Sequence, residues 1–115
     1  MPSTRFARVI YWRAKPGQLQ AYNDYLHEFV APVDHAAQRS GALETFTTLI
    51  DPRPDAPWTH MRLFVFSSAA QRAGMVEALG KAAAALTPDA ALRQARTERA
   101  ANLRERVGEA DFDVL

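Results

Sequence analysis

The stretch from Trp58 to Ser67 constrains the fold more than any other part of the chain. It combines aromatic, aliphatic and β-branched residues and follows a proline-rich segment, as is typical of a strand that begins after a turn. Alternation along a strand sends neighbouring side chains to opposite faces. One face would carry Thr59, Met61, Leu63 and Val65, and the other Trp58, His60, Arg62, Phe64 and Phe66. The second set mixes rings with an imidazole and a guanidinium, so we expect this face to contact a partner chain or a ligand.

The rest of the chain predicts strand, helix, strand, strand and helix in that order. Strands are expected over residues 5–12, 42–50 and 58–67, and helices over 18–40, 69–86 and 88–107. Pro32 lies inside the first helical pattern, whose apolar stripe keeps its phase, so we expect one bent helix rather than two. A short edge strand over residues 111–115 would follow. This order predicts an α+β, ferredoxin-like βαββα(β) fold with an antiparallel sheet and an extra C-terminal helix.

Composition narrows the class of protein. The 115 residues fit a single domain over residues 1–115 that can bury a core without disulfide or metal staples. The chain has no cysteine, which removes disulfides, thiolate metal sites and cysteine nucleophiles. A net charge of +1 gives no reason to expect nucleic acid or an anionic membrane as a partner. No apolar run reaches the ~20 residues of a membrane helix, and Met1–Arg5 lacks the apolar core of a signal peptide, so a cytoplasmic protein is expected.

In such a fold the helices cover one face of the sheet and leave the other bare. We expect the bare face to be the aromatic one, because small and aliphatic side chains suit close packing against alanine-rich helices. It would hold Arg8, Ile10, Trp12, Glu44, Phe46, Thr48, His60, Arg62, Phe64 and Phe66. The opposite assignment, the alternative, turns outward Ala7, Val9, Tyr11, Met61, Leu63 and Val65. Because a monomer rarely leaves so many rings in water, two sheets are expected to pack face to face as a homodimer with a cavity between them.

Two stretches, Tyr11–Gly17 and Phe64–Arg72, carry a family resemblance. The first is a Lys-Pro-Gly turn after a strand, and the second an aromatic-x-aromatic-x-Ser pattern followed by an arginine. Over about Phe6 to Leu86 the chain resembles the dimeric α/β-barrel superfamily, in particular its NIPSNAP-like and antibiotic-monooxygenase-like members. The resemblance implies a dimeric barrel with a pocket. The superfamily includes cofactor-free oxygenases, haem-degrading enzymes, lyases and members of no known activity. NIPSNAP-like proteins often carry a histidine where this chain has Arg62.

His60 and Arg62 are the candidate catalytic residues. An imidazole can move a proton near neutral pH, and a guanidinium can hold a carboxylate or an enolate-like oxygen. The candidate ligand-binding residues share their face and are Arg8, Trp12, Glu44, Phe46, Phe64 and Phe66. The alternative interpretation is a cross-strand ion pair at a dimer interface, formed by Glu44 with Arg62 or Arg8.

Neither a metal nor a cofactor is expected. His27 and Asp34 share one flank of the first helix and His35 lies on its outer side, but the histidine spacing of the usual helical zinc pair is missing. We interpret all three as ordinary polar residues. The arginines of the third helix alternate with glutamates and are interpreted as a solvated, salt-bridged face.

These observations predict a small homodimeric barrel that binds a small apolar or acidic organic molecule in its sheet cavity. Whether it is an enzyme stays open. A cofactor-free oxygenase or an isomerase would fit, with His60 as acid or base and Arg62 as oxyanion holder. The competing class is a non-catalytic structural or interaction dimer of the NIPSNAP-like type, whose aromatic face is filled by its own dimer contacts. An open pocket would favour the first class and a dry, filled interface the second.

Overall fold

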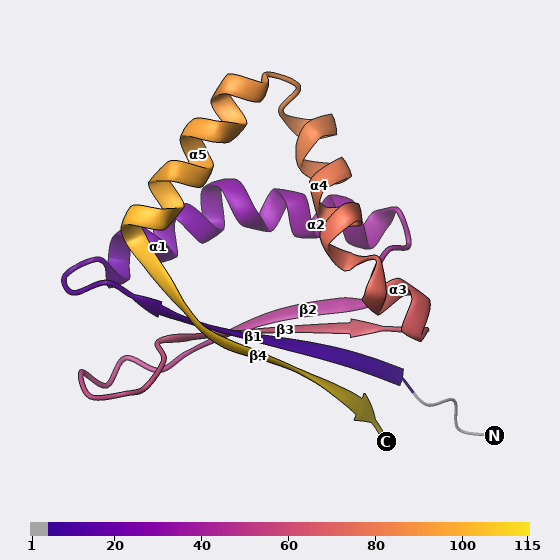
Figure 1. The fold of residues 1–115 in the computed structure, drawn as a ribbon, viewed down its shortest axis with the longest axis horizontal. Helices are drawn as coiled ribbons and strands as arrows, with labels where there is room; N and C mark the ends of the chain where they lie inside the picture. The colour runs from indigo at the N-terminus through magenta and orange to yellow at the C-terminus, as the bar shows by residue number, and fades with distance from the viewer. Residues whose placement is uncertain (1–4) are drawn as a thin grey trace.

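The sheet and all the helices pack as two layers. The structure, a computed structural model, describes residues 5–115; Met1–Thr4, part of the stretch for which no signal peptide is predicted, lie outside it. The elements are β1 (Arg5–Ala14), α1 (Leu19–Tyr25), the π-helical segment η1 (Leu26–Val30), α2 (Ala31–Arg39), β2 (Thr45–Ile50), β3 (His60–Phe66), α3 (Ala69–Ala73), α4 (Met75–Leu86), α5 (Ala90–Leu103) and β4 (Arg104–Val114). The sheet is antiparallel, in the order β2-β3-β1-β4, and the helices lie on one side of it (Figure 1). The predicted ferredoxin-like α+β fold is confirmed.

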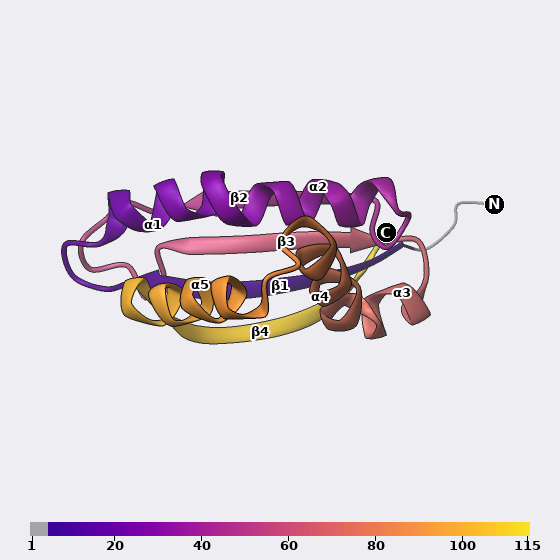
Figure 2. The same cartoon turned by 90° about the horizontal axis from the view of Figure 1, so that it is seen from above.

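The helices form two rows over the sheet (Figure 2). One row, α1 with η1 and α2, follows β2 and β3; the other, α5 with α4, follows β1 and β4. In Figure 1 the helices α4 and α5 lean toward each other and join at the point farthest from the sheet. No helix in the described part of the chain is both long and apolar enough to cross a membrane.

The first helical row is continuous across Pro32, as predicted, and its irregularity is a π-helical turn. The backbone N–H of Ala31 donates to the carbonyl of Leu26, one residue farther back than in an α-helix. Pro32 has no N–H to donate and its ring crowds the preceding turn, so a wider turn costs little here. Asp34, in the next turn, is buried against the sheet. The π-turn therefore lies one turn before Asp34, a charged residue that this helical row buries in the core.

The helix boundaries show the local signals that specify them. Ser68 caps α3, because its side chain accepts a backbone N–H of the first turn. The helix expected over residues 69–86 is interrupted at Gly74, which separates α3 from α4. The helix expected from residue 88 is present as α5, and Asp89 caps it, with its Oδ1 2.9 Å from the backbone nitrogen of Ala91.

The C-terminal segment differs from the prediction. Helix α5 ends at Leu103 instead of near Val107, and β4 is an 11-residue strand instead of a short one. It pairs along the whole of β1, with a shift of register opposite Tyr11 and Trp12 that leaves Val107 unpaired in a bulge. The prediction failed because the backbone groups of residues 104–107 pair with the distant strand β1, and no local sequence pattern indicates that pairing.

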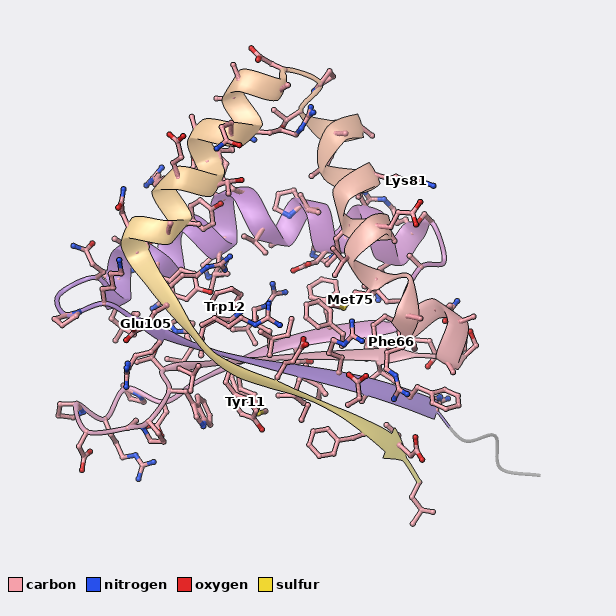
Figure 3. All side chains as sticks on the ribbon, viewed as in Figure 1. Tyr11, Trp12, Phe66, Met75, Lys81 and Glu105 are labelled. Atoms are coloured by element: carbon pink, nitrogen blue, oxygen red, sulfur yellow. The ribbon has the colours of Figure 1, made fainter. Side chains whose placement is uncertain are left out.

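The sheet buries its aromatic face beneath the helices. Phe64 and Phe66 are 2% and 0% exposed and pack in one core cluster with Ala37 and Met75. The assignment of this face to the outside was therefore wrong. Figure 3 shows Trp12 on the helix side of the sheet and Tyr11 on the opposite side.

The alternative assignment is the correct one, and the reason is packing volume. Around Phe64 and Phe66 the helices contribute the small Ala37 and Ala82 together with Met75 and Leu79. Because interiors are close-packed, the sheet must supply the bulky rings that fill the space between the layers. The smaller set instead lies on the face that no described helix covers; it includes Ala7, Val9, Tyr11, Met61, Leu63 and Val65. We call this the uncovered face.

The core consists of two separate clusters at opposite ends of the sheet. One contains Phe64, Phe66 and Met75 under α2 and α4. The other contains Tyr22 and Leu103, where α1 meets α5. A cavity lies between these clusters, where neither helix row fills the space above the middle of the sheet.

Candidate functional site

The larger cavity has a volume of about 1190 Å³ and opens to solvent between the helices and the sheet. Its floor is formed by four residues of β1 and β3, namely Ile10, Trp12, Arg62 and Phe64. Its side walls come from the η1–α2 row and from α4 and α5. The lining contributed by α4 is apolar and consists of Val76, Leu79, Gly80, Ala83 and Leu86. A concave, mainly apolar space with a few polar groups is the usual form of a small-molecule site.

A smaller cavity of about 390 Å³ lies on the other side of the first helical row, against β2. It is lined in part by Asn23, His27, Phe46 and Thr48. Both cavities reach Val30, Asp34 and Arg62. Asp34 and Arg62 thus form the polar partition between them.

Asp34 and Arg62 form a buried ion pair. Their side chains are 4% and 8% exposed, and the Arg62 guanidinium donates to Oδ2 of Asp34. Arg62 Nε also donates to Thr48 Oγ1 at 3.1 Å. Burial raises the pKa of Asp34, although the charge of Arg62 and its hydrogen bond oppose that shift. A carboxyl group held in this state can take up a proton more readily than an exposed one.

His60 lies beneath the cavity and does not line it. It is 0% exposed, and its ring centroid is 4.4 Å from that of Tyr22. Nε2 is 2.7 Å from Asn23 Oδ1, which can only accept, so Nε2 carries the proton. Nδ1 is 2.7 Å from Thr59 Oγ1, which accepts the N–H of Ala14 at 2.7 Å and can donate its own proton to the ring.

The electrostatic surroundings keep His60 neutral. Burial, followed by the charges of Arg62 and Arg104, lowers the pKa of His60 to about 4. Both ring nitrogens are engaged by neighbouring side chains, so neither is free to exchange a proton with a molecule in the cavity. This geometry argues against the predicted acid–base role of His60.

Arg104 is held at the cavity wall by two aromatic residues. Its guanidinium carbon lies 3.7 Å from the centroid of the Trp12 ring, a cation–π arrangement. Its NH1 donates to the hydroxyl of Tyr22 at 2.9 Å. Burial raises the pKa of Tyr22, so this hydroxyl stays neutral. Arg104 therefore has a fixed orientation and no charged partner within salt-bridge distance among residues 5–115.

Helix α5 contributes two more arginines to the same cavity. Arg96 lies 4.3 Å from the ring centroid of Phe29 and donates to Thr87 Oγ1 at 2.8 Å. Arg93 donates to the carbonyls of Thr87 and Pro88. Across the described chain, 5–115, neither is ion-paired, so the predicted salt-bridged face is wrong for these residues.

The predicted site residues are divided between several environments. Trp12, Arg62 and Phe64 line the larger cavity, and Phe46 lines the smaller one. Arg8, Glu44, His60 and Phe66 line neither cavity.

The predicted cross-strand ion pairs are also wrong. Arg8 pairs with Asp111 of the neighbouring β4, with Nε and Oδ1 2.8 Å apart. Glu44 pairs instead with Arg5 at 3.1 Å. The partner of Arg8 lies on a strand that the sequence prediction had made too short, and the partner of Glu44 is the first residue of β1.

Sequence reasoning missed Asp34, Arg96 and Arg104 as site residues. Asp34 had been interpreted as an ordinary polar residue, and the two arginines as part of a solvated, salt-bridged helix face. The one signal that could have found Asp34 is Pro32, since a proline within a helix can accompany a π-turn and such turns occur often at functional sites. Within residues 5–115, no group of three or more histidine or acidic side chains is arranged to hold a metal ion.

The fold and the cavity together define a ferredoxin-like α+β protein with a site between its sheet and its helices. Solved structures with this fold include HapK from Hahella chejuensis, with 15% identity over 96% of this chain and 92% of that one and a TM-score of 0.63. A NIPSNAP family protein from Agrobacterium tumefaciens matches with 15% identity over 99% and 89% of the two chains and a TM-score of 0.62. A candidate antibiotic biosynthesis monooxygenase from Chloroflexus aurantiacus matches with 16% identity over 96% and 93% and a TM-score of 0.57.

The comparisons confirm the resemblance at the level of the fold. Two other matching structures, from Bacteroides fragilis and Jannaschia sp., are described as dimeric proteins of unknown function. No family model matches the sequence, and no curated protein matches it.

Proposed function

We propose that this protein is a homodimer that binds a small, largely apolar organic molecule in the cavity between sheet and helices. The observation that carries the proposal is the cavity itself, about 1190 Å³ in volume, with an apolar wall on α4 and a few polar groups on its floor. Its size is comparable to that of sites for small organic ligands. Filling this cavity with an apolar molecule should be favourable, because it removes the apolar surface of the wall from water.

Gly80 offers a direct test because it lines the cavity and a Cβ added there would meet nothing within 4 Å. Gly80→Trp should therefore place an indole in the cavity without a backbone clash. The neutral fluorophore N-phenyl-1-naphthylamine should bind the wild type and Gly80→Ala, and should lose its binding to Gly80→Trp. Equal fluorescence enhancement with all three proteins would contradict the proposed site.

The homodimer is proposed from the uncovered face. Exposed apolar side chains such as Leu49 and Phe112, which are 47% and 48% exposed, lie on it together with the smaller set of β1 and β3. An apolar sheet face of this kind is covered in most soluble proteins, and a second copy of the same face would cover it symmetrically. Structures described as dimeric share the fold and support this arrangement.

Light scattering after gel filtration tests the dimer. Leu49→Glu and Phe112→Glu should give monomers, whereas Leu92→Glu, at an exposed position on α5, should not. A wild-type monomer, or a dimer that all three variants retain, would contradict the proposed interface. The competing reading, a structural dimer without a ligand, is supported if the dimer is confirmed and no apolar probe enters the cavity.

Catalysis is a second candidate, and Asp34 is the observation that favours it. A proton transfer, or an oxygenation without a cofactor, needs a group that removes a proton from the substrate. Asp34 is buried, lines both cavities and has a raised pKa, whereas His60 is sealed from them. In this candidate, Asp34 replaces His60 as the base and Arg62 keeps the predicted role of holding the resulting oxyanion.

A further inference from the structure

The charged groups of the larger cavity are unequally distributed. Its lining contains four arginines and two carboxylates, which are Arg62, Arg93, Arg96 and Arg104 with Glu28 and Asp34. Arg62 and Asp34 neutralise each other. The other three arginines come from α5 and the first residue of β4, so positive charge gathers at one end of a cavity whose α4 wall is apolar.

Two of these arginines are preorganised for an anion. Arg104 is stacked on Trp12 and hydrogen-bonded to Tyr22, and Arg96 is stacked on Phe29. Each guanidinium carries five N–H donors, and the hydrogen bonds described above use one on each, to a hydroxyl oxygen. The remaining donors have no carboxylate within salt-bridge distance in the described chain.

Partial burial strengthens the attraction of these two arginines for an anion. Arg96 and Arg104 are half-buried, so an anion beside them would be screened less than on an open surface. Stacking on aromatic rings fixes both side chains before the ligand arrives, which reduces the entropy lost on binding.

We propose that the ligand of this cavity is an amphipathic organic acid, whose anionic group binds Arg104 and Arg96 and whose apolar body lies against Leu79 and Ala83. This inference rests on the proposed ligand-binding function and adds the chemical class of the ligand. It also explains why Arg96 of α5 and Arg104 of β4 line the cavity, which would not be required of arginines on a solvated surface.

Two probes with the same aromatic body separate this inference from the proposed function. 1-Anilinonaphthalene-8-sulfonate carries an anionic group, and N-phenyl-1-naphthylamine lacks it. The sulfonate should bind at least about tenfold more tightly, and Arg104→Gln or Arg96→Gln should remove most of that difference while leaving the neutral probe unchanged. Arg13→Gln is the matched control, because Arg13 is exposed, pairs with Glu105 and does not line the cavity.

Each outcome has a definite meaning. If both probes bind equally and Gly80→Trp excludes both, the cavity binds apolar molecules and the anion site is overturned. If neither probe binds, or Gly80→Trp changes nothing, the proposed function fails and the inference fails with it. Arg104→Lys keeps the charge but loses the planar fork, so partial recovery of sulfonate binding relative to Arg104→Gln would support a charge-based site. A sulfonate affinity that is the same in Arg104→Gln, Arg96→Gln and Arg13→Gln would overturn it.

Discussion

Removing one member of the Asp34–Arg62 pair should destabilise the protein far more than removing both. Both side chains are at least nine-tenths buried, so neither charge can be solvated when its partner is lost. We consider Arg62→Met, which leaves the carboxyl group alone, Asp34→Leu, which leaves the guanidinium alone, and the double variant.

The expected magnitudes follow from burial. Each single variant should lose about 3–5 kcal/mol of unfolding free energy near neutral pH, because an unpaired charge remains in the core. The double variant should range from neutral to about 1–4 kcal/mol more stable than the wild type, since apolar side chains avoid the desolvation of both ions. For a domain of this size, a loss of about 4 kcal/mol should lower Tm by roughly 15 °C.

The pH dependence distinguishes the two single variants. Burial already raises the pKa of Asp34, and losing Arg62 removes the charge that opposes this shift. In Arg62→Met the penalty should therefore be complete at neutral pH and should shrink as the pH falls and the carboxyl group becomes protonated. In Asp34→Leu the guanidinium stays charged at every accessible pH, so its penalty should not change.

Urea denaturation followed by circular dichroism, at one fixed protein concentration, measures these effects. The control is Arg13→Met, which removes the cation of an exposed pair and should cost less than about 1 kcal/mol. Losses below about 1 kcal/mol in both single variants, or a double variant equal to their sum, would refute the argument that the pair is buried and coupled.

Three further predictions concern stability. Because the pKa of His60 is lowered to about 4, its contribution is complete above its ordinary value of about 6.5 and is lost as the pH falls toward 4, about 3 kcal/mol in all. Urea titrations at several pH values should show this dependence in the wild type and not in His60→Gln. Identical slopes of unfolding free energy against pH in the two proteins would contradict the prediction. Gly80→Ala should raise the unfolding free energy by up to about 1 kcal/mol, whereas Gly41→Ala should lower it, since Gly41 has a φ of +84°. Asp89→Ala should cost about 1 kcal/mol through the lost cap of α5, and no change in Tm would indicate that water replaces the cap.

Much of the fold could be predicted from the sequence because local rules specify it. Alternation identified β1 and β3, and the loop prolines separated β2 from β3. Local signals also mark the helix ends, since Ser68 caps the start of α3 and Gly41, with its positive φ, follows the end of the first helical row. The order of these elements was sufficient for the ferredoxin-like topology, since few arrangements of strands and helices satisfy the rules of connection.

The length of β4 could not be predicted in this way. Residues Arg104 to Val107 have no local preference that distinguishes a helix end from a strand, and the pairing with β1 decides between them. A sequence window contains no information about a ladder formed with residues about a hundred positions away.

The position of the site depends on which face of the sheet lies under the helices, and side-chain alternation alone does not show this. The sequence by itself determined that Trp12, Arg62 and Phe64 share one face of the sheet, and the structure keeps them together on the cavity floor. Only the tertiary structure decided that this face lies under the helices, because the choice depends on which layer has volume to fill. The same packing brought Asp34 and Arg104 to these residues from distant elements, and long-range contacts of this kind leave no periodic signal in the chain.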